Sequence, residues 1–78
     1  MTVDLREFIR EIPDFPEPGI IFRDITPLLL NPAAARQATE EMVDFGRRLD
    51  VDIVVAAEAR GFILGGATAQ RLEAGFVP

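Results

Sequence analysis

The chain has 78 residues, a formal net charge of −5 and a hydrophobic content of 49%. This length allows one small domain at most, and the apolar content excludes an intrinsically disordered chain. Cys, His, Ser and Lys are absent, and all 8 basic residues are Arg. A Cys/His metal site, a disulfide, a Ser–His or Cys–His nucleophile and a Lys Schiff base are therefore excluded. The carboxylates, arginines and backbone amides that remain suit phosphate chemistry with a hard cation such as magnesium.

The acidic charge balance argues against nucleic acid as a partner, because a protein that binds phosphate backbones needs a basic surface. No apolar run in the sequence reaches the length of a membrane span. The first residues carry Asp4 and Glu7 and lack the apolar stretch of a signal peptide. We therefore expect a cytoplasmic protein that contacts neither nucleic acid nor membrane.

The first part of the chain predicts a helix, a stiff connector and a short strand. Asp4 is the expected N-cap of the helix and Pro13 its end. The prolines and glycine of residues 13–19 indicate a connector, and residues 20–22 a strand. The apolar residues of the predicted helix fall at helical spacing and are Leu5, Phe8, Ile9 and Ile12.

The second part predicts an α/β fold. Asn31 and Pro32 are a strong helix start, and the helix should run to about Leu49. Residues 51–57 predict a strand buried on both faces, as in a parallel sheet. Residues 62–72 predict a second helix that ends at Gly75, before a strand at residues 76–77. The expected buried stripe of the first of these helices is Ala35, Ala38, Met42, Phe45 and Leu49.

Two short segments carry residues suited to binding. Glu58, Ala59, Arg60 and Gly61 lie between a buried strand and a helix, where helix N–H groups and an arginine can bind an anion. The alternative is a tight turn with a Glu–Arg ion pair, and the residues alone leave both open.

The second segment is Ile21–Pro27, in which Phe22 stands beside Arg23 after the proline-rich connector. An aromatic ring there could stack on a flat heterocycle while backbone groups read its edge. The residues alone favour the alternative, in which Phe22 is a core residue and Arg23 pairs with Asp24 on the surface.

The two segments in this order closely resemble the N-terminal part of the adenine phosphoribosyltransferase family, from Leu5 to Pro78. The residues that carry the resemblance are PDFPEPGIIFRDITPLL, then VVAAEARGFILG, then AGFVP. The resemblance implies a partial, truncated type I phosphoribosyltransferase fold, a parallel sheet flanked by helices with an N-terminal hood. It also implies synthesis of AMP and pyrophosphate from adenine and phosphoribosyl pyrophosphate, and a homodimer in the full-length family.

The resemblance assigns roles to seven residues. Phe22 matches the family's adenine-stacking ring, and Ile21 and Arg23 match positions whose backbone reads the base edge. Magnesium would bind mainly through phosphoribosyl pyrophosphate, and these residues include no catalytic residue and no metal ligand. The expected pyrophosphate-binding residues are Glu58, Ala59, Arg60 and Gly61.

We expect residues 1–78 to be one incomplete domain, with a hood segment at residues 1–30 and the start of the core at residues 31–78. The family's Thr-Gly-Gly-Thr loop, which binds the 5′-phosphate, is not in this sequence, so turnover by these residues alone is not expected. Two alternatives stay open. One is a non-catalytic purine- or nucleotide-binding module, which the lack of a basic DNA-binding element disfavours. The other is an interaction fragment without a ligand.

Overall fold

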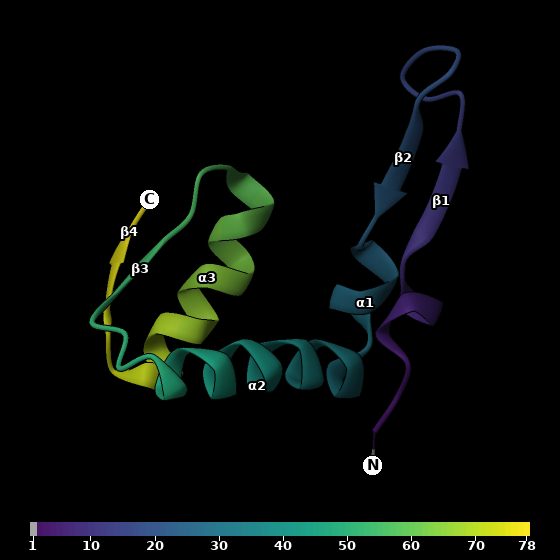
Figure 1. Ribbon diagram of the computed structural model, residues 1–78. Coiled ribbons are helices and arrows are strands. Elements are labelled where there is room, and N and C mark those ends of the chain that lie inside the picture. Colours follow the sequence, from purple (N-terminus) through teal and green to yellow (C-terminus); the bar gives the residue numbers. More distant parts are fainter. Residues whose placement is uncertain (1) are drawn as a thin grey trace. The chain divides into compact units, whose positions relative to one another are not determined.

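The structure is a computed structural model that describes residues 2–78 (Figure 1). The chain divides into two compact units, one up to Ala38 and one from Thr39, and each is described by itself. None of the helices in the described part has the length and apolar character that a membrane crossing requires. The elements in chain order are the 3-10 helix η1 (Leu5–Phe8), β1 (Arg10–Pro13), β2 (Ile21–Asp24), α1 (Thr26–Leu30), α2 (Pro32–Arg48), β3 (Ile53–Val55), α3 (Ala59–Leu72) and β4 (Gly75–Val77).

The first unit begins with a single helical turn and an antiparallel hairpin. Asp4 caps η1 as predicted, since its Oδ1 accepts the backbone N–H of Arg6 at 3.1 Å. The prediction that this helix continues to residue 12 is wrong, because residues 10–13 form β1 and pair with β2. Strand pairing places Ile12 opposite Phe22, and this cross-strand contact outweighs the helical spacing of the apolar residues.

A small apolar cluster holds the first unit together. Leu28, Ala34 and Ala38 are its buried members, and half-buried apolar side chains from residues 3–8 pack on it. The predicted N-cap is confirmed, because Asn31 Oδ1 accepts the N–H of Ala34 at 3.0 Å. The side-chain amide of Gln37 bonds both backbone groups of residue 3 at 2.7 Å, which ties the start of the chain to α2.

The buried side of α2 differs from the predicted stripe. Of that stripe, Ala38 is buried, but Phe45 and Leu49 are 59% and 61% exposed. Val43 and Gly46 are buried in their place. The packing at this position depends on the small size of Gly46. A Cβ there would lie only 2.8 Å from a methyl carbon of Leu72, the α3 side chain that covers it.

The second unit is a parallel β–α–β arrangement, as predicted. β3 pairs in parallel with β4, with Val54 opposite Phe76, and α3 joins the two strands. Burial on both faces was predicted and is wrong for these residues, because Ile53 and Val55 are 57% and 71% exposed. The strand is covered on the face that carries Val54 and is open on the other.

The end of α3 also differs from the prediction. The chain turns at Glu73, which adopts a left-handed φ of 55°, and the N–H of Ala74 then bonds the carbonyl of Ala69 at 2.9 Å. Gly75, predicted as the helix stop, is instead the first residue of β4. Its N–H bonds the carbonyl of Asp52 at 3.0 Å, which starts the pairing between the two strands.

Two adjacent glycines of α3 provide a test of its packing. A Cβ at Gly65 would lie 2.9 Å from a ring carbon of Phe76 and 3.2 Å from the Cβ of Ala56, whereas a Cβ at Gly66 meets nothing within 4 Å. Overpacking costs about 1–3 kcal/mol. Replacing a helical Gly by Ala in open space stabilises by about 0.5–1 kcal/mol. We therefore expect Gly65→Ala to lower the free energy of unfolding in urea and Gly66→Ala to raise it. Equal stability of the two variants would contradict this packing.

Candidate functional site

The seven residues with predicted roles form two groups, one in each unit. Residues 21–23 are consecutive on β2 in the first unit. Residues 58–61 lie at the start of α3 in the second unit. Each group is brought together by its own local structure.

Phe22 lies on one face of the hairpin and is held there by a second aromatic ring. Side chains alternate along a strand, so Phe22 and Asp24 share one face of β2 while Ile21 and Arg23 share the other. The rings of Phe15 and Phe22 have centroids 5.4 Å apart and planes at 78°, an edge-to-face contact. Phe22 is half-buried, and Ile21 is 54% exposed.

The opposite face of the hairpin is polar. Arg23 Nε donates to Glu11 Oε2 at 3.2 Å, and both side chains are well exposed. A hollow of about 370 Å³ lies beside them and is also lined by Arg6 and Ile9. In an antiparallel pair, residues two apart direct their backbone groups to the same edge of the strand. Ile21 and Arg23 therefore present their N–H and C=O groups in one direction.

Asp24 supports the end of β2, a role that the sequence interpretation missed. It is 8% exposed, and its carboxylate accepts three hydrogen bonds. Thr26 donates its N–H at 3.0 Å and its hydroxyl at 2.8 Å, and Arg10 Nη2 lies at 2.6 Å. The suggested Arg23–Asp24 surface pair is thus replaced by Arg23–Glu11 and Arg10–Asp24. The spacing Asp-x-Thr at a helix start, typical of an Asx turn, is the signal that could have revealed this role.

The three contacts fix the end of β2 to its neighbours. One contact reaches Arg10 on β1, and the other two reach the first residue of α1. The hydrogen bonds from the Thr26 N–H and hydroxyl, and then that from Arg10, hold the pKa of Asp24 below its ordinary value of 3.8. The charged form of Asp24 is therefore the form that fastens the hairpin carrying Phe22.

Residues 58–61 form the beginning of α3, three residues earlier than predicted. Glu58 is the extended N-cap residue, and its carbonyl accepts the N–H of Phe62 at 3.0 Å as the first helical bond. Ala59, Arg60 and Gly61 thus make the first turn, and all are exposed. First-turn N–H groups such as those of Ala59 and Gly61 point out of the helix end, which carries a partial positive charge.

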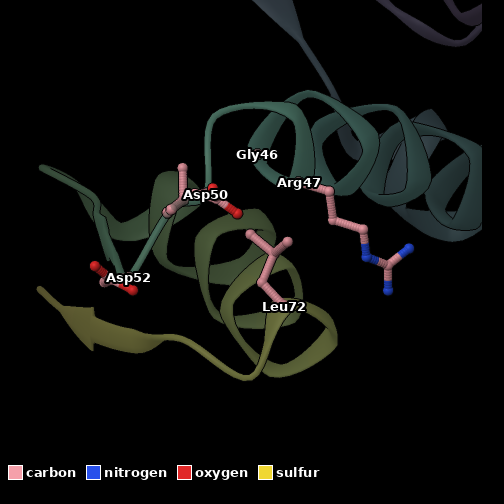
Figure 2. Close-up of a pocket in the computed structure, with 6 residues that line it drawn as sticks. Gly46, Arg47, Asp50, Asp52 and Leu72 are labelled. Atoms are coloured by element: carbon pink, nitrogen blue, oxygen red, sulfur yellow. The ribbon is translucent and has the colours of Figure 1, made fainter.

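The segment lies just beyond the carboxyl end of β3, the edge where ligands bind in open α/β sheets. An apolar hollow of about 320 Å³ extends from Val54 on β3 to Gly61 and Gly65 on α3. A second hollow of about 320 Å³ includes Arg47, Asp50 and Asp52 and lies at the other end of β3 (Figure 2). Because this second hollow lies at the opposite end of β3 from residues 58–61, it is separate from the predicted anion site.

Comparison with known proteins gives consistent matches over nearly the whole chain, although no family model matches it. The adenine phosphoribosyltransferase of Thermotoga neapolitana is 60% identical over 76 residues, 97% of this chain and 45% of that relative. The crystal structure of the enzyme from Thermoanaerobacter pseudethanolicus gives a TM-score of 0.89 at 44% identity, over 95% of this chain and 44% of that one. The enzyme from Giardia lamblia, complexed with 9-deazaadenine, gives 0.86 at 41% identity, over 94% of this chain and 40% of that one.

These matches define the fold as part of the α/β fold of the type I phosphoribosyltransferases. Within that class, the chain corresponds in sequence and structure to the N-terminal part of adenine phosphoribosyltransferase. It spans about 45% of the length of the curated Thermotoga relative that it matches.

The charge on Asp24 predicts that the first unit is sensitive to acid. Because the folded pKa is depressed below 3.8, the contribution of Asp24 is complete above that pH and is lost as pH falls through the folded pKa. Asp24→Asn keeps an acceptor for Thr26 but not the charge that binds Arg10. We expect this variant to unfold at a lower temperature than the unaltered chain near pH 7, with the difference shrinking below pH 3.8.

Thermal unfolding followed by circular dichroism between pH 7 and pH 2.5 measures this difference. Glu11→Gln is the matched control, since it removes the exposed ion pair of the same hairpin and should change little. The assignment of Asp24 is overturned if both variants follow the same pH dependence as the unaltered chain.

Proposed function

We propose that this chain provides the adenine-binding and pyrophosphate-binding residues of an adenine phosphoribosyltransferase. The reaction proposed for the whole enzyme joins adenine to phosphoribosyl pyrophosphate and releases AMP and pyrophosphate. The observation that carries the proposal is the hairpin that holds Phe22 edge-to-face against Phe15, within a chain whose fold matches a protein complexed with 9-deazaadenine.

The adenine part of the proposal rests on the geometry of β2. A phenyl ring can stack on any flat base through its π face, because every base has a π face of its own. Ile21 and Arg23 flank Phe22 and direct their backbone groups to one edge of the strand. One ring for the face of the base and one strand edge for its nitrogens would orient adenine for attack on the anomeric carbon of the ribose.

The pyrophosphate part of the proposal rests on the start of α3. Backbone N–H groups at a helix N-terminus favour phosphate oxygens, and the guanidinium of Arg60 adds a planar pair of donors. Glu58 occupies the N-cap position of α3, but its side chain makes no capping hydrogen bond to the first-turn N–H groups. Catalysis would then depend on positioning and on stabilising the charge of the leaving pyrophosphate, without a covalent protein nucleophile.

In the proposed reaction, magnesium binds together with phosphoribosyl pyrophosphate. Within residues 2–78, no group of three or more Asp and Glu side chains comes together in a way that could hold a metal ion. Magnesium would be held mainly by the phosphates of phosphoribosyl pyrophosphate, since Mg²⁺ commonly binds through substrate phosphates and water. We also propose a homodimer, which the family resemblance implies, and a cytoplasmic location. Turnover by residues 1–78 alone is not expected, because the Thr-Gly-Gly-Thr loop is not in this sequence.

Removal of the Phe22 ring tests the adenine site. Truncating an aromatic side chain that stacks on a base costs about 1–3 kcal/mol, or roughly 5- to 150-fold in affinity. We expect Phe22→Ala to weaken adenine binding by that factor in isothermal titration calorimetry. Phe45→Ala, which removes a phenyl ring that is 59% exposed in the second unit, is the matched control and should bind as the unaltered chain does. Equal affinity of the two variants for adenine would rule out the proposed stacking role.

Removal of the Arg60 guanidinium tests the pyrophosphate site. A hydrogen bond between charged groups contributes about 1.5–3 kcal/mol, or roughly 10- to 150-fold. We expect Arg60→Ala to weaken the binding of magnesium pyrophosphate by that factor, measured by calorimetry. Arg47→Ala is the control, because Arg47 lines the hollow at the other end of β3. Loss of binding in the Arg47 variant but not in the Arg60 variant would move the anion site to that hollow.

A further inference from the structure

The loop that joins β1 to β2 is fastened by its own hydrogen bonds. The N–H of Phe15 donates to the carbonyl of Ile20 at 3.1 Å, and the N–H of Ile20 donates to the carbonyl of Glu17 at 3.3 Å. Asp14 Oδ1 accepts the N–H of Gly19 at 3.0 Å across the base of the loop. The loop therefore fixes the backbone of Phe15 relative to the hairpin, which a slack connector would not do.

Two residues of the loop adopt backbone conformations that close it. Asp14 has a φ of 55° and Gly19 a φ of 88°, both in the left-handed region. Gly reaches that region without steric cost, and Asp tolerates it because its side chain bonds nearby backbone. The turn chemistry and the hydrogen bonds thus support the same loop geometry.

The hydrogen-bonded loop places the Phe15 ring in contact with the ring of Phe22. The edge-to-face contact between them has a centroid distance of 5.4 Å and an interplanar angle of 78°. Neither ring belongs to the apolar cluster of the first unit, which consists of residues near Leu28 and Ala34. Phe15 is also 49% exposed, so general burial does not account for its position.

An edge-to-face contact sets an angle between two rings, because the positive edge of one ring meets the negative face of the other. An aliphatic side chain of similar volume fills the same space without that angular preference. Stacking on a flat base requires a defined ring plane, since a tilted ring loses contact with part of the base. The orientation of Phe22 is therefore the property that Phe15 can control.

We propose that Phe15 is a positioning residue for adenine recognition, which holds the plane of the Phe22 ring in the orientation that stacks on the base. The inference rests on the proposed adenine-binding role of Phe22. Phe15 itself need not touch the base. The proline-rich segment at residues 13–19 thereby gains a role in adenine binding in addition to joining two strands.

The test compares a ringless and a ring-bearing variant of the 78-residue chain. Phe15→Leu keeps apolar volume and removes the ring, whereas Phe15→Tyr keeps the ring. An edge-to-face contact is worth a factor of roughly 2 to 10. We expect Phe15→Leu to weaken adenine binding by that factor in calorimetry, and Phe15→Tyr to restore it to within about twofold of the unaltered chain.

A spectroscopic measurement separates orientation from general loss of structure. The NMR shifts of the Phe22 ring protons report the neighbouring ring current, so they should move in Phe15→Leu and stay close to the original values in Phe15→Tyr. Phe15→Ile supplies a second ringless variant if the leucine variant loses the hairpin, as judged by circular dichroism. Phe45→Leu controls for loss of an exposed phenyl ring and should change neither measurement.

The outcomes distinguish this inference from the proposed function. Adenine binding that depends on Phe22 but is equal in Phe15→Leu and Phe15→Tyr overturns the positioning role and leaves the proposed function standing. Adenine binding that is absent from the unaltered chain, or that persists unchanged in Phe22→Ala, overturns the proposed role of Phe22 and this inference with it. Weaker binding in the ringless variants, with rescue by Phe15→Tyr, supports both.

Discussion

Close approach of backbone across small side chains is the constraint on which this structure depends. Within residues 2–78, three of the five buried apolar residues are alanines, and the only large one in the first unit is Leu28. Small side chains remove little apolar area from water, so burial of this kind contributes a modest driving force. The second unit offsets this modest driving force by close packing, because α3 lies against β4 at Gly65 and against α2 at Gly46.

The first unit compensates differently, through directional polar contacts. Asp24 accepts bonds from β1 and α1 together, and a side-chain amide on α2 binds the start of the chain. A carboxylate that is 8% exposed is tolerated because every contact it makes is to a donor. The proposed binding groups therefore stand on hydrogen-bonded scaffolds outside the apolar cluster. Phe22 sits on a fastened hairpin, and the residues around Arg60 sit on a helix end.

Features set by neighbouring residues could be predicted from the sequence, whereas features set by tertiary contacts could not. Helix caps at Asp4 and Asn31 were predictable because the capping bond lies within three residues of the cap. The parallel β–α–β order followed from element type alone. The strand at residues 10–13 was missed because its pairing partner lies ten or so residues further on, beyond any local window. The buried side of α2 was misplaced because helical spacing favours large apolar residues, whereas the packing selected small ones. The roles proposed for the motif residues follow from the resemblance. Phe15 was recognised through its ring contact, and Asp24 through its hydrogen bonds, although the Asp-x-Thr spacing was a local signal for the latter.

The strand register constrains the length of the loop at the tip of the hairpin. Ile12 stands opposite Phe22, and successive side chains alternate between the two faces. Gain or loss of a single loop residue that shifted the pairing by one place would turn the Phe22 ring to the face that now carries Arg23. Substitutions at an exposed loop position such as Glu17 leave the pairing as it is. Among relatives, exposed loop positions such as Glu17 should therefore vary much more readily than the parity of the loop's length.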